Sequence, residues 1–226
     1  MKAPTPPRQI IKAVYHLRHE MGLKATGRAV GKRVGISGPS VMKMVTGLAK
    51  KGLLKNEKYK GITLTPKGFL VAMRQVRCHR LWETFLHHQM GFGLMAIHLE
   101  AERLEYNTSD ALMASMAQML AHPLFDPHGD PIPSETGVLP DVSEMIPLHQ
   151  IPDGTTGMIA RLSYQTELFS QFCDRHGMNI GDEITVISKE PTGGINLKLG
   201  NEEIYATKET ASQIYLFNQD NGHITQ

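Results

Sequence analysis

The chain has 226 residues, of which 41 % are hydrophobic and 20 % are charged, and its formal net charge is only +2. No apolar run approaches the roughly 20 residues that a membrane-spanning helix needs, and two distant cysteines, Cys78 and Cys173, exclude a disulfide scaffold. We therefore expect a cytoplasmic protein with reduced thiols, without a signal peptide and without a membrane partner.

The charge is divided unevenly along the chain. Residues 1–80 hold 18 of the 24 lysines and arginines but only 2 of the 22 acidic residues, Glu20 and Glu57. The first third therefore has a formal charge of +16, whereas residues 81–226, with 6 basic and 20 acidic residues, have −14. A basic block of this size is typical of a nucleic-acid-binding domain, and the alternative is a solvated basic face.

The basic block is predicted to contain a helix-turn-helix. Apolar residues at helical spacing predict a helix that begins near Arg8 and ends at Gly22, and a short apolar segment follows it. Ser37 is a candidate N-cap for the next helix, with Pro39 inside the first turn and Gly52 as the stop. Two helices joined by a few residues around Gly35 describe a helix-turn-helix.

A β-hairpin is predicted directly after this helix, with short strands around residues 53–56 and 62–65. Its turn carries two basic residues with an aromatic residue between them, Lys58, Tyr59 and Lys60. Such a wing suits contact with a phosphate backbone, and the alternative is a solvated turn.

The rest of the chain divides into a helical part and a strand-rich part. Pro66 begins a long helix to about Met90, and two further helices are predicted at about 94–106 and 110–121. After a stretch rich in Pro, Gly and Asp, short strands at 157–163, 182–188, 195–200 and 202–207, with a short helix at 166–177, predict a small β-barrel. The predicted domains are a winged helix-turn-helix domain (1–66), a helical domain (67–122), a linker (123–147) and a terminal β domain (148–226).

Two of the central helices offer histidine and glutamate on one face. His79 and Glu83 are four residues apart, and His98, Glu102 and Glu105 follow the spacing i, i+4 and i+7. A helix presents such pairs to one metal ion, although a surface salt bridge is the more common reason for a His–Glu pair.

A third group lies in the sequence FDPHGD, where Asp126 and His128 stand on a Pro–Gly turn. They are candidates to complete the same metal site. The alternative is that Asp126 caps the turn and that His128 is exposed. Oxygen and nitrogen ligands without a thiolate suit Mn²⁺, Fe²⁺ or Zn²⁺.

The order of these features resembles the iron- and manganese-dependent transcriptional repressors of the diphtheria toxin repressor type. The resemblance rests on SGPSVMKMV, EKYKGITLTPKG, HRLWETFL, HLEAERLE and HPLFDPHGDPIP in that order, followed by a β domain. It implies a mainly α fold with small β parts: a winged helix-turn-helix domain, a helical dimerisation and metal-binding domain, and an SH3-like (FeoA-like) β-barrel. It also implies a non-enzymatic homodimer that binds a palindromic DNA operator and represses genes of metal uptake.

The resemblance also assigns residues to the two kinds of site. The residues implied at base edges are Ser37, Pro39 and Lys43, and those implied at phosphates are Arg28, Ser40, Lys58, Tyr59 and Lys60. The residues implied as metal ligands are His79, Glu83 and His98 in an ancillary site, Glu102 and Glu105 in a regulatory site, and Asp126 and His128 as a further pair.

The chain departs from the family pattern at the regulatory site. Gln9 stands where the family usually has Asp, Glu or Met, and Tyr106 stands where it has His. An amide and a phenol are poor ligands for first-row metals. In the β domain, the ligands that some members add fall near Gln165 and Leu168, which are equally unsuited.

Three hypotheses follow for the function. The first is a metal-responsive DNA-binding repressor, in which metal clamps the N-terminal helix against the central helices. The second keeps DNA binding but loses metal sensing, with a structural ion at the ancillary ligands. The third, from another class, is a metal-dependent hydrolase, which would leave the basic block unexplained.

Overall fold

The computed structural model describes residues 7–163 and 167–217. Its contacts group the chain into two compact units. The first contains residues 1–82, 101–116 and 133–139, and the second contains residues 83–100, 117–132 and 140–226. The predicted domain boundaries are a different division of the chain and remain a prediction.

The first unit begins with the predicted N-terminal helix, which the structure divides into two forms. Helix α1 (Pro7–Tyr15) continues into a π-helical turn (His16–Glu20), because the Met21 N–H donates to the His16 carbonyl five residues earlier, at 3.0 Å. Gly22 follows in the left-handed region, at φ 63°, and ends the helix as predicted.

The helix-turn-helix is formed by α2 (Gly27–Val34) and α3 (Gly38–Lys50). The Thr26 and Ser37 side chains cap the two helices, and Gly35 at φ 70° turns the chain between them. A Cβ at Gly31 would lie 2.5 Å from the Ile36 carbonyl oxygen, so the turn closes tightly only over glycine. The predicted helix-turn-helix is therefore confirmed.

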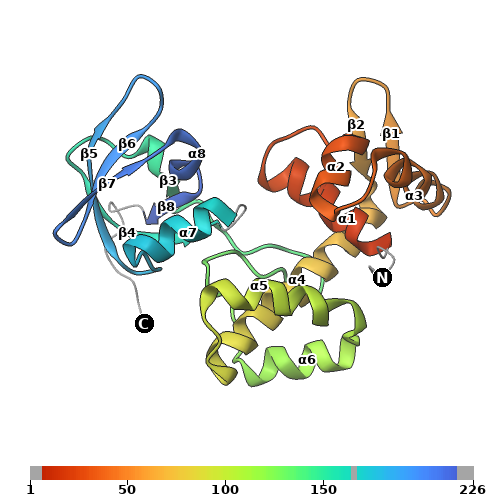
Figure 1. The fold of residues 1–226 in the computed structure, drawn as a ribbon. Helices are drawn as coiled ribbons and strands as arrows, with labels where there is room; N and C mark the ends of the chain where they lie inside the picture. Colours follow the sequence, from red (N-terminus) through yellow and green to blue (C-terminus); the bar gives the residue numbers. More distant parts are fainter. Residues whose placement is uncertain (1–6, 164–166, 218–226) are drawn as a thin grey trace. The chain divides into compact units, whose positions relative to one another are not determined.

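The wing follows as strands β1 (Leu54–Glu57) and β2 (Gly61–Leu64), which pair antiparallel with Leu54 opposite Leu64. Figure 1 shows this hairpin projecting next to α3. Each strand is shifted by one residue from the prediction. The shift arises because Gly61, at φ 77°, pairs with Glu57 and leaves a three-residue turn, in which Tyr59 is also left-handed at φ 70°.

Three helices make up the central part: α4 (Pro66–Met90), α5 (Leu94–Leu104) and α6 (Asp110–Met119). A 3-10 turn, Glu105–Asn107, follows α5. A Cβ at Gly68 would lie 1.9 Å from the Leu53 carbonyl oxygen, so the start of α4 packs directly on the chain that follows α3. The first unit has its own apolar core, which includes Ile10, Val41 and Met73.

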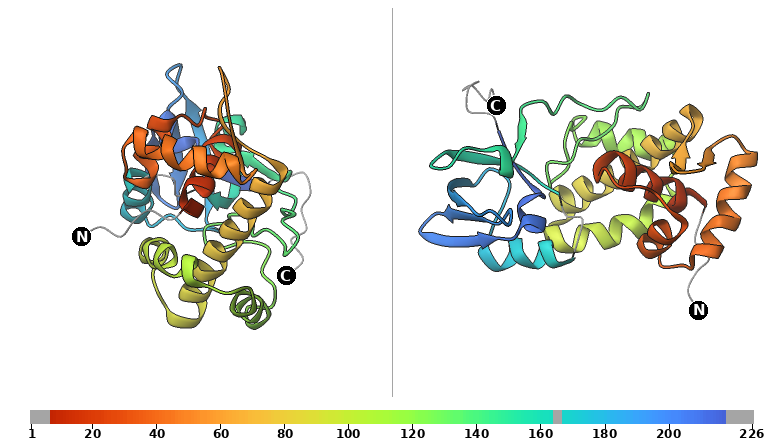
Figure 2. Two further views of the ribbon diagram at one scale, coloured as in Figure 1. Left: turned by 90° about the vertical axis from the view of Figure 1, so that its right-hand side faces the viewer. Right: turned by 90° about the horizontal axis from the view of Figure 1, so that it is seen from above.

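The second unit contains a six-stranded antiparallel sheet in the order β3-β8-β4-β5-β6-β7. The strands are β3 (Met145–Pro147), β4 (Thr156–Leu162), β5 (Glu183–Lys189), β6 (Ile195–Leu199), β7 (Glu202–Ala206) and β8 (Ile214–Phe217). Helix α7 (Glu167–His176) lies along one side of this sheet in both Figure 1 and Figure 2, and α8 (Lys208–Ala211) is a single turn.

The core of the sheet confirms the predicted small β domain. Phe169 and Cys173 of α7 are buried against strand residues that include Ile184 and Leu197. Register shifts in β4, between Ile159 and Arg161, and in β5 bend the strands, as closure of a small barrel requires. The sequence patterns predicted β4 to β7 but missed the short β3 and β8.

Candidate metal centre

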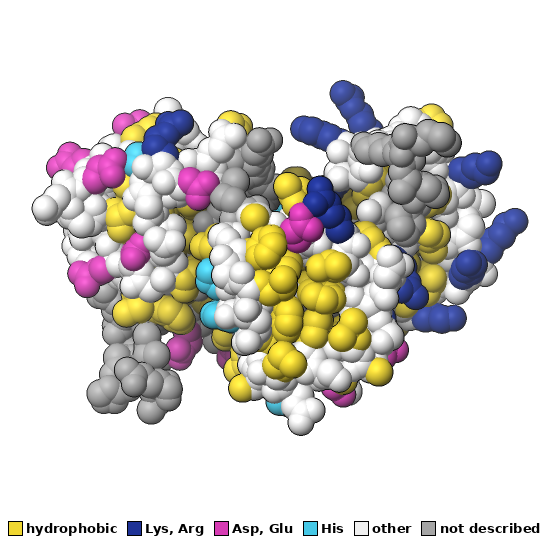
Figure 3. Space-filling view, turned by 60° about the horizontal axis from the view of Figure 1, so that its bottom comes forward, with side chains coloured by type: hydrophobic (Ala, Val, Ile, Leu, Met, Phe, Trp, Pro, Cys, Tyr) yellow, Lys and Arg dark blue, Asp and Glu magenta, His cyan; other side chains and the backbone are white. Residues whose placement is uncertain are grey.

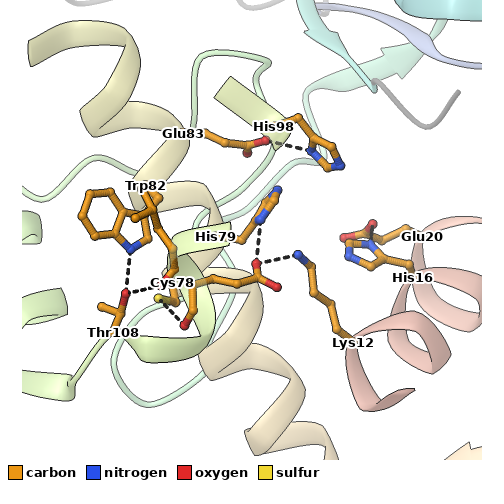
Figure 4. Close-up of polar contacts among 11 residues, drawn as sticks. Lys12, His16, Glu20, Cys78, His79, Trp82, Glu83, His98 and Thr108 are labelled. Atoms are coloured by element: carbon orange, nitrogen blue, oxygen red, sulfur yellow. Dashed lines mark hydrogen bonds and ion pairs between the residues drawn. The ribbon is translucent and has the colours of Figure 1, made fainter. Parts of the chain in front are cut away.

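Helix α4 places His79 and Glu83 one turn apart, and both side chains are buried. His98 comes from α5, and its Nδ1 lies 3.0 Å from Glu83 Oε1. One potential ligand atom of each of these three residues lies within 4.8 Å of the others. Figure 4 shows Glu83 and His98 directed toward each other above His79.

A second group shares Glu83. Glu83, Asp126 and His128 each offer one ligand atom within 4.8 Å of the others, and all three are buried. The two groups therefore bring five of the predicted ligands together around one carboxylate: His79, Glu83, His98, Asp126 and His128.

The Asp126–His128 turn is built by its own hydrogen bonds. Asp126 Oδ1 accepts the N–H groups of His128 and Asp130, each at 2.9 Å, and Phe125 pairs with Pro131 across the turn. Asp126 therefore caps the turn, as the alternative reading expected. The same alternative predicted that His128 is exposed, and this is wrong, because His128 is only 3 % exposed.

The turn is also tied to the β domain. The Leu162 N–H of β4 donates to the His128 carbonyl at 2.9 Å. A Cβ at Gly129 would lie 2.2 Å from the Ala160 carbonyl oxygen, and Gly129 has φ 78°, so only glycine permits this approach. Both ligand candidates of the turn are thus held by backbone geometry.

Hydrogen bonds also orient the histidines. His128 Nε2 lies 3.3 Å from the Leu94 carbonyl, which only accepts, so Nδ1 would be the nitrogen that binds a metal. His79 Nδ1 lies 2.6 Å from Glu105 Oε2, so His79 donates there and Nε2 would be its ligand atom. A carboxylate or carbonyl behind a histidine is the usual arrangement at metal sites.

Glu105 itself is fully buried, and the Lys12 ammonium of α1 donates to the same Oε2 at 2.7 Å. Burial would raise the pKa of Glu105, but the charge of Lys12 and the hydrogen bond from His79 outweigh it and lower that pKa to about 2. Lys12 and His79 therefore hold Oε2 of this carboxylate, whereas the buried Oε1 has no hydrogen-bond partner among the described residues.

The residues implied at the regulatory site are not gathered in the same way. Glu102 is exposed, and within residues 7–163 and 167–217 neither Glu102 nor Glu105 joins a group of three potential ligands. Gln9 lies near Tyr106, and burial, with the Glu105 charge beside it, raises the pKa of the Tyr106 phenol. Gln165 lies outside the described residues, and Leu168 is an exposed apolar side chain.

The potential metal ligands around Glu83 therefore differ from those around Glu105. The group around Glu83 combines imidazole nitrogens and carboxylate oxygens, and it fits a divalent first-row ion. Around Glu105 lie the His79 imidazole, an amide, a phenol and an ammonium group, and the charge of the ammonium group opposes a divalent ion there.

Sequence reasoning missed Lys12. The available signal is that Lys12 is the one charged residue between Arg8 and Arg18, in a helix whose neighbouring residues are apolar. A lysine among buried apolar residues requires an acidic partner, but periodicity does not name that partner.

The predicted DNA contacts all lie at the surface of α2, α3 and the wing. These exposed residues are Arg28, Ser37, Pro39, Ser40, Lys43, Lys58, Tyr59 and Lys60. The Ser37 hydroxyl also accepts the Ser40 N–H at 3.3 Å, and the Lys58 ammonium lies 5.3 Å from the centre of the Tyr59 ring. Figure 3 shows Lys and Arg gathered on the N-terminal part and most Asp and Glu elsewhere.

Three family models match consecutive parts of the chain. An iron-dependent repressor N-terminal DNA-binding domain matches residues 8–62, an iron-dependent repressor metal-binding and dimerisation domain matches 65–134, and a FeoA domain matches 146–216. The chain belongs to the iron-dependent repressor family. The fold, with DNA-binding, dimerisation and SH3-like FeoA parts, is the fold of that family.

Family relatives resemble this chain over nearly its whole length. The iron-dependent repressor IdeR of Mycobacterium tuberculosis is 27 % identical over 217 residues, which are 90 % of this chain and 93 % of that protein. The diphtheria toxin repressor of Corynebacterium diphtheriae is 25 % identical over 215 residues, with the same coverage.

Another relative is much longer. A probable metal transport system membrane protein of Chlamydia trachomatis is 40 % identical over 89 residues, so this chain spans 20 % of its length. Within the described part of our chain, by contrast, no helix has the length and apolar character to cross a membrane.

Solved structures give the same result. A manganese-dependent transcriptional repressor in complex with manganese matches with a TM-score of 0.84 and 28 % identity, covering 94 % of this chain and 100 % of that one. The structure of ScaR with bound Zn²⁺ matches with a TM-score of 0.80 and 28 % identity, covering 93 % and 98 %. A divalent metal ion is therefore the cofactor to consider.

Proposed function

We propose that this chain is a homodimeric transcriptional repressor that binds a palindromic DNA operator and controls genes of metal homeostasis in the cytoplasm. The observation that carries the proposal is the gathering of five buried or half-buried ligands around Glu83, within a chain whose N-terminal third is strongly basic. Relatives named as iron- and manganese-dependent repressors, and one named as a metal transport protein, support the link to metal supply.

The proposed metal ligands are His79, Glu83, His98, Asp126 and His128. A bound divalent ion supplies positive charge to the buried carboxylates of Glu83 and Asp126, which otherwise repel each other. The hydrogen bond from His79 to Glu105 orients the His79 ring, and the hydrogen bonds within the turn orient the Asp126 carboxylate. Mn²⁺, Fe²⁺ and Zn²⁺ all suit this set of ligands.

The proposed reader of the operator is α3 together with the wing. Ser37, Pro39 and Lys43 would contact base edges in the major groove, and Arg28, Ser40, Lys58, Tyr59 and Lys60 would contact phosphates. Two such readers in a dimer must lie about one DNA turn apart, roughly 34 Å, to match a palindrome.

The proposed dimer surface is on the central helices. Figure 3 shows hydrophobic side chains gathered on these helices, and their exposed large hydrophobic residues include Met90, Leu99, Leu104, Leu112 and Met119. The family model that matches this part is a dimerisation domain, which supports this assignment.

The test first lets the protein select a DNA duplex from a random pool in Mn²⁺. Binding of this duplex is then measured by fluorescence anisotropy, beginning with protein from which a chelator has removed all metal. Mn²⁺, Fe²⁺ and Zn²⁺ are then titrated separately. If metal regulates DNA binding, one ion raises the affinity more than tenfold, which corresponds to about 1.4 kcal/mol. The same titration is made with Asp126→Asn, which removes the charge of a proposed ligand. Asp130→Asn, at a carboxylate outside the ligand groups, is its matched control.

A second candidate keeps the DNA reader and loses the sensing. The proximity of Gln9 and Tyr106 favours it, because two uncharged side chains lie together where metal ligands were expected. Tight DNA binding that no metal changes would support this candidate, and a tenfold response to metal would exclude it.

A further inference from the structure

We propose that the ammonium group of Lys12 is the cation that joins the DNA-binding helices to the central helices, so that this junction needs no metal ion of its own. The inference rests on the proposed function, because it assigns a way in which the DNA reader is held in place.

The contact connects parts of the chain that are far apart in sequence. Lys12 belongs to α1, whose residues Ile10, Ile11 and Val14 lie in the core of the first unit. Its Nζ donates at 2.7 Å to Oε2 of Glu105, 93 residues later, in the 3-10 turn after α5. Figure 4 shows the Lys12 side chain extending from α1 toward His79, which contacts the same carboxylate oxygen.

The pair is shielded from water. The Lys12 side chain is 8 % exposed and the Glu105 side chain is 0 % exposed. A buried carboxylate must be neutralised or it opposes folding, so a cation is required at this position. Lys12 meets that requirement from within the chain.

The same carboxylate oxygen has a second donor. His79 Nδ1 lies 2.6 Å from Glu105 Oε2, so two donors already converge on this atom. A divalent ion bound to Glu105 would lie next to the Lys12 ammonium, and the two positive charges would repel each other in a site that excludes water.

Two neighbours of the pair, Gln9 and Tyr106, are equally unsuited to a metal ion. Gln9 precedes Lys12 by one helical turn and lies near the Tyr106 phenol, which directly follows Glu105. Both partners are uncharged, so this second contact between α1 and the 3-10 turn also forms without an ion. Two contacts that need no metal therefore fix α1 to the central helices.

The junction is also connected to the proposed metal centre. His79 donates to Glu105 through Nδ1 and belongs, through its ring, to the ligand group with Glu83 and His98. Lys12 thus lies behind a metal ligand, with Glu105 between them, and acts as a positioning residue for both the DNA reader and His79.

The first experiment measures DNA affinity of the full chain in EDTA, with the self-selected duplex as the probe. Lys12→Met keeps the length of the side chain and removes its charge, and we expect it to lose at least tenfold in affinity. Lys67→Met removes the same charge from an exposed position on α4, and we expect less than threefold loss. Equal affinities of the wild-type chain and Lys12→Met, or no wild-type binding in EDTA with strong binding in Mn²⁺, would overturn the proposal.

The second experiment counts bound ions by equilibrium dialysis against Mn²⁺, without DNA. We expect one ion per wild-type chain, lost in Asp126→Asn and retained in Lys67→Met. An ion that remains bound when His98→Ala and Asp126→Asn are combined would contradict the proposal, because neither ligand group could then hold it and it would have to bind at Glu105 and displace Lys12. If Lys12→Met does not fold, this count of bound ions still tests whether the junction needs a metal ion.

The two experiments separate the failure of each proposal. If the wild-type chain binds no duplex with or without metal, the proposed function fails. The ion count, together with the melting temperature of Lys12→Met in EDTA against Lys67→Met, still tests the junction.

Discussion

His79 Nδ1 lies 2.6 Å from Glu105 Oε2, and this hydrogen bond connects two clusters of charged residues. On one side, Glu105 holds Lys12 of α1. On the other side, His79 precedes Glu83, the carboxylate shared by both groups of potential ligands, by one turn of α4. A single histidine therefore contacts the carboxylate that binds the N-terminal helix and belongs to the candidate metal centre.

Lys12→Met is expected to destabilise the chain by about 3 kcal/mol, because removal of one partner of a buried ion pair leaves the other charge uncompensated. The measurement is the free energy of unfolding in urea, in EDTA. Lys67→Met is the control and should change this free energy by less than about 0.5 kcal/mol. A loss of under 1 kcal/mol in Lys12→Met would show that His79 alone compensates Glu105.

Asp126→Asn is expected to weaken metal binding by more than about tenfold. The amide oxygen can still accept the His128 and Asp130 N–H groups, so the turn is retained while the charge is lost. Isothermal titration with Mn²⁺ measures the affinity. Asp130→Asn is the control, because Asp130 pairs with Arg161 and belongs to neither ligand group. Equal losses in both variants would point to the turn rather than to a ligand.

Lys43→Ala is expected to relax base preference at one operator position and to cost about 1–3 kcal/mol there. The side chain is exposed on α3, where a recognition helix presents its base contacts. Competition with duplexes that carry single substitutions measures the preference. An equal loss on all duplexes would show that Lys43 contacts phosphate only.

Lys58→Ala is expected to weaken binding to all duplexes alike and to lower the slope of log affinity against log salt by about 1. Lys58 lies at the wing tip beside Tyr59, where contact with the backbone is expected. Titrations at several salt concentrations measure the slope. An unchanged slope would remove Lys58 from the phosphate contacts.

Stability is expected to fall as the pH drops below about 6.5, partly through His16. Burial lowers the pKa of His16 in spite of its pairing with Glu20, and Arg33 and Lys12 lower it further. The unfolded chain therefore takes up this proton at a higher pH than the folded chain does. Stability is fully present above the unfolded pKa and is lost as the pH falls toward the folded one.

His16→Gln should reduce that loss, as measured by urea unfolding in EDTA between pH 7.5 and 5.5. His19, whose pKa burial also lowers, should account for part of the remaining slope. An identical slope in His16→Gln and wild type would show that other groups cause the loss.

The sequence by itself determined most of the architecture. The helical spacing around Ile10, the Ser37 cap and Gly52 predict the helix-turn-helix, and these are local signals that the structure retains. The alternation in β4 to β7 is local as well. The His–Glu spacing of α4 names His79 and Glu83 as candidate ligands, because one turn of helix aligns them whatever surrounds it.

The tertiary structure decided what local patterns cannot encode. Only the packing of α1 shows that Lys12 reaches Glu105, since no periodicity connects residues 93 positions apart. The turn around Gly129 buries His128 and brings Asp126 to Glu83, which spacing along the chain does not predict. A buried charge requires a partner, and the folded chain alone determines whether that partner is a side chain or a metal ion.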